Sequence, residues 1–364
     1  MNDRAGSDTV RRAVAAGTGA VAAVAARGAY AALTRYPPAG EKTWARTNHR
    51  GEPVTLLEGT AVTVGAVAGV VAGQWVSAAA AARLHPAAFQ PSPEIVNDIA
   101  NYSPGDVGGE EIAVAVAGLG ALACGMIDDL RGSAKRRGLR GHLGALRHGE
   151  VTTGTIKLGG LAATGLATAL LEGGDPADIV INAGLVAGGA NLLNLFDLRP
   201  GRAIKAMALG AALIGSWGPD SLEAVSAPVG AALALLPEDL GEQAMLGDAG
   251  ANALGAMLGA AAAQTLPKSA RAGLLAGIVA LTVASEKISF TKVIAASPAL
   301  NWLDMLGRRP PQGAAHGVEL ANLVPAQHGR RHSGRHRRPD SRDTRGGRGS
   351  WLSSFLKTVA RREP

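Results

Sequence analysis

The chain has 364 residues, of which 47% are hydrophobic but only 3% aromatic, and it carries 50 glycines and a net charge of +7. Its single cysteine, Cys124, excludes an internal disulfide framework. The mean hydropathy of +0.14 would suit a soluble protein. However, the apolar residues gather in blocks of about 16 to 25, close to the ~20 needed to cross a bilayer. We therefore expect an all-α, polytopic transmembrane bundle whose helices pack through small residues.

About nine to ten membrane spans are expected, and nine can be placed. The first is the weakest, because Arg27 lies inside it and alanine and glycine dominate it. We take it as a span rather than a removed signal peptide, since no small-residue cleavage site is followed by a soluble domain. The nine predicted spans cover residues 11–33, 57–82, 111–127, 156–171, 179–197, 203–217, 222–236, 249–266 and 271–287.

The charges of the loops predict the orientation of the bundle. The loop 130–155 has six Lys and Arg against one acid, Glu150, and is expected to be cytoplasmic. The segment 85–110 has four acids and no Lys or Arg, so we expect it outside. Lys268 and Arg271 contradict this pattern mildly, because they lie on the predicted outer side.

Acidic residues follow or precede three of the spans. Asp128 and Asp129 end the third span, Asp197 ends the fifth, and Asp248 stands just before the eighth. A solvated helix end explains each acid taken singly, but alternation of the spans puts all four on the same cytoplasmic face. Their common side therefore favours a cation site at the membrane edge.

Two sequence runs around these acids are more specific. In "NLLNLFDLRPG", Asn191, Asn194 and Asp197 stand three apart, which spreads them over one face of a helix. Such groups near a bilayer are costly unless they face the bundle interior or a watery cavity. A hydrogen-bonded network between helices would also explain the two asparagines. In "MLGDAGANALG", Asp248 lies between glycines that permit close backbone approach.

Taken in order, these runs resemble a known family. The chain resembles the polyprenyl-phosphate N-acetylhexosamine-1-phosphate transferases, which include the phospho-MurNAc-pentapeptide translocase of peptidoglycan synthesis. The resemblance covers about residues 44 to 290 and depends on four motifs. They are "RTNHRGEPVTLLEG", "GMIDDLRG", "NLLNLFDLRPG" and "LGDAGANALG".

The resemblance implies a transferase of cell-envelope glycan synthesis in a bacterial cell membrane, with its active face cytoplasmic. A polyprenyl phosphate attacks the diphosphate of a UDP-linked amino sugar, and UMP leaves. The expected cofactor is Mg²⁺, which is commonly held by one or two carboxylates plus substrate phosphates. A homodimer is the family-like expectation for assembly.

Site residues are carried over motif by motif. Asp248 and Asp197 are expected to hold the metal or contact the diphosphate, and Asp197 also counts as catalytic. Asp128, with Asp129, is expected to act on the lipid phosphate, either as a base or by holding the metal. Asn191, Asn194 and Gly247 of the same motifs are expected to bind substrate. Arg46, Asn48 and Lys157 are expected to bind it by attracting its phosphates electrostatically.

Three departures from the family keep a second hypothesis open. The run "DLRPGR" keeps Gly201 but lacks the family's second acid, the last cytoplasmic loop (residues 286–310) has no histidine, and the tenth span of the peptidoglycan branch is absent. The alternative is a catalytically altered member that binds the lipid carrier or acts as a scaffold in envelope assembly. Retention of the acids favours the enzyme, since unpaired carboxylates near a bilayer are expensive.

The last segment, 307–364, is predicted to be a basic cytoplasmic tail after a transmembrane domain covering 1–306. It has 13 Lys and Arg against 4 Asp and Glu, a net charge of +9. We expect it to be mostly disordered and attracted to anionic lipids, with an interfacial helix near 350–362. Charge alone also permits nucleic-acid binding, but the nearby membrane is the favoured partner.

Overall fold

The computed structural model describes residues 2–84, 109–131, 144, 148 and 152–310. These residues belong to one compact unit, Met1–Pro310. The predicted tail beyond Pro310 and most of the basic loop 130–155 lie outside the described residues. Within them the fold is helical, with one two-stranded antiparallel sheet. The elements are α1 (Asn2–Arg35), α2 (Glu41–Trp44), β1 (Ala45–Thr47), β2 (Pro53–Thr55), α3 (Leu57–Leu84), α5 (Gly109–Arg131), α7 (Thr153–Glu172), α8 (Pro176–Phe196), α9 (Arg202–Gly215), α10 (Pro219–Leu240), α11 (Gly247–Thr265), α12 (Lys268–Ser285), α13 (Phe290–Ala296) and α14 (Pro298–Met305).

Each of the nine predicted spans falls on one helix, apart from one or two residues at the ends of some, so the helical class is confirmed. Four helices, α5, α7, α8 and α12, are long and apolar enough to cross a membrane, and α3 contains a shorter apolar stretch, Leu57–Gly73. The chain therefore has the helices of a membrane protein. Two further helices are not long or apolar enough to count as spans. Helix α9 has only 14 residues, and α10 contains Pro228, Pro237 and several acids.

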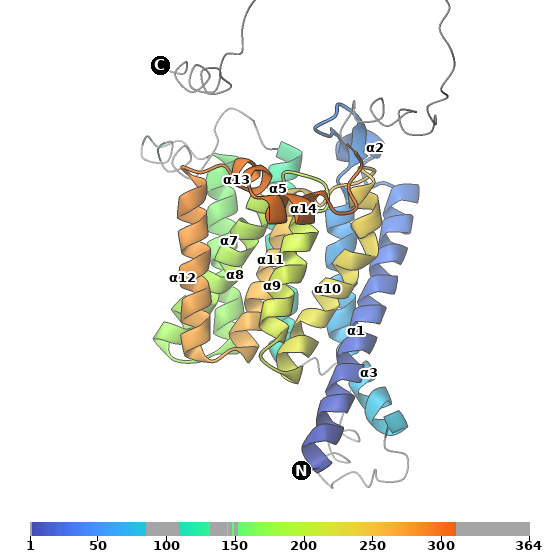
Figure 1. Ribbon diagram of the computed structural model, residues 1–364, viewed down its shortest axis with the longest axis vertical. Helices are drawn as coiled ribbons and strands as arrows, with labels where there is room; N and C mark the ends of the chain where they lie inside the picture. The colour runs from blue at the N-terminus through green and yellow to red at the C-terminus, as the bar shows by residue number, and fades with distance from the viewer. Residues whose placement is uncertain (1, 85–108, 132–143, 145–147, 149–151, 311–364) are drawn as a thin grey trace, which may run out of the picture. The chain divides into compact units, whose positions relative to one another are not determined.

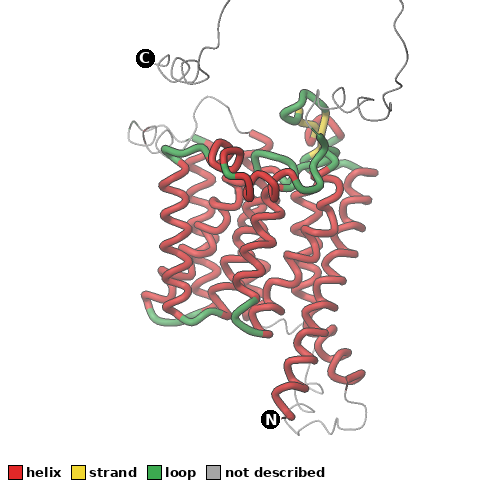
Figure 2. Tube along the Cα trace, in the orientation of Figure 1, coloured by secondary structure: helices red, strands yellow, loops and turns green. Residues whose placement is uncertain are grey.

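Helix α11 forms the centre of the unit, and almost all of its residues are buried. It packs against α5 and α8, and α12 covers the other side of α8. A second group, α1, α3 and α10, packs together on the opposite flank (Figure 1). Figure 2 shows the short strands at the same end of the bundle as α13 and α14.

Glycines let the helix backbones touch. A Cβ on Gly255 of α11 would collide with the carbonyl oxygen of Gly189 in α8. The same holds for Gly230 of α10 against Gly19 of α1, and for Gly59 of α3 against the Leu246 carbonyl. The small-residue composition thus brings backbones together at the contacts between helices, as the sequence predicts.

The helix starts follow local signals. Asp175 caps α8 by accepting hydrogen bonds from the Ala177 and Asp178 amides, and Pro176 occupies the first turn. Thr152 caps α7 through the Thr155 amide. Asp175 also meets Lys268, whose hydrogen bond lowers the pKa of Asp175 to about 2.

The two basic residues that contradict the charge pattern are paired with acids. Lys268 Nζ lies 2.6 Å from Asp175 Oδ2 and 3.3 Å from Asp178 Oδ2. Arg271 donates to Asp178 at 2.9 Å and to the buried Asn182 at 2.7 Å. The ion pairs explain why these side chains are tolerated here, but the orientation rule counts Lys and Arg whatever their partners, so the two residues still contradict the predicted orientation mildly.

We expect Arg271→Gln to lower the free energy of unfolding by about 2 kcal/mol, because Asp178 and Asn182 would lose their shared donor in a poorly solvated place. Thermal unfolding in lipid nanodiscs would measure this. Lys268→Gln is the matched control, since that ion pair is exposed and should matter little. Equal losses in the two variants would contradict the assignment.

Candidate active site

The four predicted acids meet at one end of the bundle. Asp128 and Asp129 lie in the last turn of α5, Asp197 directly follows α8, and Asp248 lies in the first turn of α11. We call Asp128, Asp129, Asp197 and Asp248 the carboxylate cluster. The four acids therefore lie on one face of the bundle, as the alternation of the spans predicts.

Asp129 holds the start of α11. Its Oδ1 accepts a hydrogen bond from the Asp248 amide at 3.1 Å, and its Oδ2 accepts one from the Ala249 amide at 2.9 Å. These are amides of the first helical turn, which have no partner inside the helix, and a carboxylate there also offsets the helix dipole. One turn earlier, Gly125 lets α5 approach the Asp248 carbonyl closely. Asp129 therefore positions Asp248.

Gly247 supplies the turn that joins these groups. Its φ of +62° is a conformation that favours glycine. Its amide donates a hydrogen bond to Asp197, and a Cβ at this position would lie 2.9 Å from Asp129 Oδ2. Gly247, which was expected to bind substrate, thus brings Asp197 and Asp129 close to the same stretch of backbone.

Lys157 is the cation of the cluster. It lies on α7 with its side chain 9% exposed, and its Nζ is 2.5 Å from Asp248 Oδ2 and 4.0 Å from Asp128 Oδ2. The Asp128 side chain is itself within hydrogen-bond reach of Asp248. Asp128 and Asp129 therefore have different surroundings, since one faces Lys157 and the other caps α11.

The other predicted binding residues have separate surroundings. Arg46 donates to the Asp129 carbonyl at 2.5 Å and to the Thr43 and Ala45 carbonyls, which ties β1 to the end of α5. Asn191 and Asn194 lie on the last turns of α8, partly exposed. Within the described ranges, their side-chain amides make no hydrogen bond, so they are available to a ligand.

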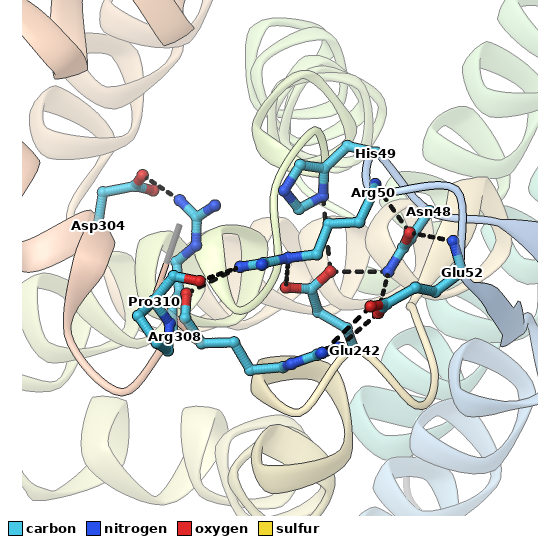
Figure 3. A network of polar contacts seen from close by, with 9 residues as sticks. Asn48, His49, Arg50, Glu52, Glu242, Asp304, Arg308 and Pro310 are labelled. Atoms are coloured by element: carbon cyan, nitrogen blue, oxygen red, sulfur yellow. Dashed lines mark hydrogen bonds and ion pairs between the residues drawn. The ribbon is translucent and has the colours of Figure 1, made fainter. Parts of the chain in front are cut away.

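Asn48 belongs to a network at the tip of the hairpin (Figure 3). Its amide donates to Glu242 at 2.7 Å and to Glu52 at 3.3 Å. Arg50 donates to Glu242 at 2.7 Å and to the Pro310 carbonyl at 2.9 Å. The network therefore fixes the hairpin to the loop before α11 and to the segment that follows α14, at Pro310.

His49 lies beside this network, with its Nδ1 3.7 Å from Glu242. Burial lowers the pKa of His49, and the positive charges of Arg199 and Arg308 lower it further. His49 and these arginines were not among the predicted site residues. His49 and Arg199 lie inside the quoted motifs "RTNHRGEPVTLLEG" and "NLLNLFDLRPG", so their place in these motifs was the available signal.

Two buried acids were also missed. Glu58, in the first turn of α3, is 0% exposed, and neither of its carboxyl oxygens has a hydrogen-bond partner among the described residues. Asp239, near the end of α10, is 2% exposed and accepts a hydrogen bond from the Gly201 amide. Both lie within electrostatic reach of the carboxylate cluster. The acid in "LLEGT", at the very start of an apolar run, was the available signal for Glu58.

Neither a scan against protein-family models nor a search of curated proteins finds a match to this chain. Its function therefore has to be inferred from the chemistry of the carboxylate cluster.

The donor set of the cluster fits Mg²⁺ in kind. It consists of carboxylate oxygens, which hard cations prefer, and Lys157 lies close to both Asp128 and Asp248. No group of three or more acidic, histidine or cysteine side chains among the described residues has the spacing of a complete metal site. Since Mg²⁺ is usually held by one or two carboxylates, waters and substrate phosphates, the cluster suits a metal that arrives with substrate.

An ion pair next to the site holds α14. Asp304, 6% exposed, accepts from Arg202 Nε at 2.6 Å and from Arg308 at 2.7 Å. Burial alone would raise the pKa of Asp304, but Arg202 and Arg308 hold it below the ordinary value. The pair joins the start of α9 to the segment that ends at Pro310.

Because the folded pKa of Asp304 is depressed, its contribution to stability is present above the unfolded value of ~3.9 and is lost as pH falls through the folded pKa. We expect Asp304→Asn to cost about 3 kcal/mol at neutral pH, since it leaves buried arginines without a counter-charge. Unfolding measured from pH 7 to pH 3 should show a smaller acid loss in the variant than in the unchanged protein. Parallel pH curves would contradict this role.

Proposed function

We propose that the chain crosses a membrane about nine times and transfers a sugar 1-phosphate from a UDP-linked amino sugar to a polyprenyl phosphate, with Mg²⁺ and with release of UMP. The observation that carries the proposal is the meeting of Asp128, Asp197 and Asp248 with Lys157 at one end of the bundle. Carboxylates for a cation and a lysine for phosphate are what a reaction between two phosphate groups requires.

In this proposal Asp248 and Asp197 hold the metal, which supplies neutralisation of the diphosphate charge when bound. Asp128 faces the lipid phosphate. An oxygen of that phosphate attacks the phosphorus next to the sugar, and the bond to UMP breaks. Lys157 offsets negative charge on the phosphates as it grows at the bridging oxygen. Asp129 acts through the position of Asp248 and does not touch substrate.

An apolar cavity beside the cluster supports a lipid acceptor. It has a volume of about 140 Å³ and opens among α8, α9, α11 and α12. Phe196, which directly precedes Asp197, is part of its wall. Only a short part of a prenyl chain fits this volume, and such a part lying there would present its phosphate at the end of α8. The cavity is lined, beside Phe196, mainly by Leu192, Leu193, Met207, Leu213, Leu258 and Ile278.

The proposed orientation puts the cluster at the cytoplasmic side of a bacterial cell membrane, because the basic loop 130–155 directly follows α5. The UDP-sugar is made in that compartment's aqueous phase, so the donor would reach the cluster without crossing the bilayer. A homodimer and contact of the basic tail with anionic lipids complete the proposal.

UMP release tests the function. Purified protein in nanodiscs is given Mg²⁺, undecaprenyl phosphate and a panel of UDP-amino sugars, beside Asp248→Asn and Asp197→Asn. We expect turnover with one donor and a loss of at least about 100-fold in each variant. Glu41→Gln, an exposed acid of α2, is the control and should keep its rate.

No UMP with any donor, together with binding of undecaprenyl phosphate, would replace the transferase with a carrier-binding or scaffold protein. The absence of histidine in residues 286–310 is the observation that favours this second candidate. Absence of both turnover and binding would reject the two functions together.

A further inference from the structure

The segment that follows α12 contacts the start of α9 and contains the short helices α13 and α14, which lie at the end of the bundle in Figure 1. Arg202, the first residue of α9, is buried and donates to Thr291 of α13 at 2.9 Å and to Asp304 of α14 at 2.6 Å. Phe290 of α13 stacks on Phe196 at the end of α8. One side of each short helix is therefore held against the protein.

The outward side of α14 is apolar. Asp304, the only acid of α14, is 6% exposed. Trp302 and Leu306 stand two positions before and after it, which puts them about 200° away around the helix, and they are 66% and 51% exposed. A surface helix in water has the reverse arrangement, with charged residues outward and apolar residues inward. The outward side of α14 therefore suits an apolar surrounding.

Exposed apolar side chains continue along the whole segment. Lys287 and Lys292 are exposed beside them, and the described stretch 287–306 exposes no acid. Apolar and tryptophan side chains, flanked by lysines that can reach towards water, are typical of a segment that lies at a membrane surface. Five large apolar side chains are 44% to 66% exposed, and we call them the outward apolar face: Ile288, Val293, Leu300, Trp302 and Leu306.

The bilayer is the nearest partner for this face. Helix α12 ends at Ser285 and is long and apolar enough to cross a membrane, so the segment begins close to the membrane surface. Helices α13 and α14 have 7 and 8 residues, far fewer than the ~20 needed to cross. The segment can therefore lie along the surface but cannot span the bilayer. Exposed lysines at that level attract anionic lipid headgroups.

We propose that residues 287–306 lie along the bilayer surface. The outward apolar face sits between the headgroups and the acyl chains, and Lys287 and Lys292 are directed to the phosphates of anionic lipids. The proposal depends on a membrane position for α12 and is independent of the transfer reaction. It gives a role to the loop that lacks the histidines of the resembled family, because this loop ties the contact between Arg202 and Asp304 to the membrane surface.

Fluorescence quenching by brominated lipids tests the position of Trp302. The full chain and Trp302→Phe are placed in nanodiscs, and the difference between their emissions isolates Trp302 from the other tryptophans. An interfacial helix is buried only about 5 to 10 Å into the boundary. We therefore expect phosphatidylcholine brominated near its headgroup to quench Trp302 at least about twofold more than phosphatidylcholine brominated near its chain end. Because Trp302 is exposed, Trp302→Phe should keep the unfolding temperature.

A tryptophan placed outside the membrane is the control. Glu41→Trp in the Trp302→Phe background adds one at an exposed position of α2, which lies beyond the ends of the long helices in Figure 1. It should be quenched by acrylamide in water and not by brominated lipid, the reverse of Trp302. Quenching of Trp302 by acrylamide alone would place the face in water, and quenching by neither reagent would place it against protein. Either result would overturn the proposal.

The lysines are tested with a minor fraction of lipid brominated near its headgroup. Phosphatidylglycerol, which is anionic, should quench Trp302 about twofold more than phosphatidylcholine at the same fraction, because lysines gather anionic lipid around them. Lys287→Gln combined with Lys292→Gln should remove this preference and leave the quenching by phosphatidylcholine unchanged. Equal quenching by the two lipids in the unchanged protein would overturn the role of the lysines.

Discussion

Asp128→Asn and Asp129→Asn are expected to produce different defects, although the residues are adjacent. Asp129 accepts two backbone hydrogen bonds at the start of α11, and an asparagine would turn an amide NH₂ towards one of those donors. We expect a loss of about 2 kcal/mol in the free energy of unfolding. Asp128 faces Lys157, so its variant should keep its unfolding temperature and lose UMP release by at least about 100-fold.

Thermal unfolding and UMP release, both measured in nanodiscs on each variant, separate the two roles. Mg²⁺ titration adds a third readout, because a positioning residue that acts through Asp248 should change the rate at saturating Mg²⁺ as well as the Mg²⁺ requirement. Equal loss of stability in the two variants would contradict the division of roles. Unchanged stability in Asp129→Asn would show that α11 needs no cap from α5.

Lys157→Met is expected to have the second large effect. It would leave Asp248 and Asp128 facing each other without a cation, and breaking one side of a poorly solvated ion pair typically costs about 3 to 5 kcal/mol. Transfer should also be abolished, since the proposed charge on the phosphates loses its partner. The change in unfolding free energy and the rate of UMP release are the measurements.

The double variant Lys157→Met with Asp248→Asn makes this prediction specific. Removal of both charges should recover most of the lost stability, because Asp128 then no longer faces a second charged carboxylate at position 248. Activity should stay absent. Losses that simply add would mean that Lys157 and Asp248 stabilise the fold independently. Lys268→Met, at an exposed pair, is the control for replacing a lysine.

The long helices could be predicted from the sequence because apolar blocks of membrane length leave few alternatives to a helix. The prediction ended the seventh span at 236, yet α10 continues to Leu240 and carries Glu238 and Asp239 with it. Those acids broke the apolar pattern. They are tolerated because Glu238 pairs with Arg27 of α1 and Asp239 accepts from Gly201, partners that are remote in sequence.

The position of the carboxylate cluster could be predicted from the sequence, but the contacts of each carboxylate could not be predicted. Alternation of the spans brings Asp129, Asp197 and Asp248 to one end. It does not reveal that Asp129 faces backbone amides or that Gly247 donates to Asp197, because these contacts depend on the direction of single side chains. Asn48 shows the same limit, since its partner Glu242 lies 194 residues further along the chain.

The contacts between glycines limit how this protein can change. A Cβ on Gly255, Gly189 or Gly230 would collide with the backbone of the helix opposite. In an ordinary core, a larger side chain can be compensated by a smaller neighbour. Glycine has no side chain that a substitution could make smaller. Every substitution at these positions enlarges the residue, and no second substitution opposite can restore the fit. We therefore expect a saturation screen to tolerate exchanges among Ala, Val and Leu on the lipid-facing surface while rejecting nearly every change at these glycines.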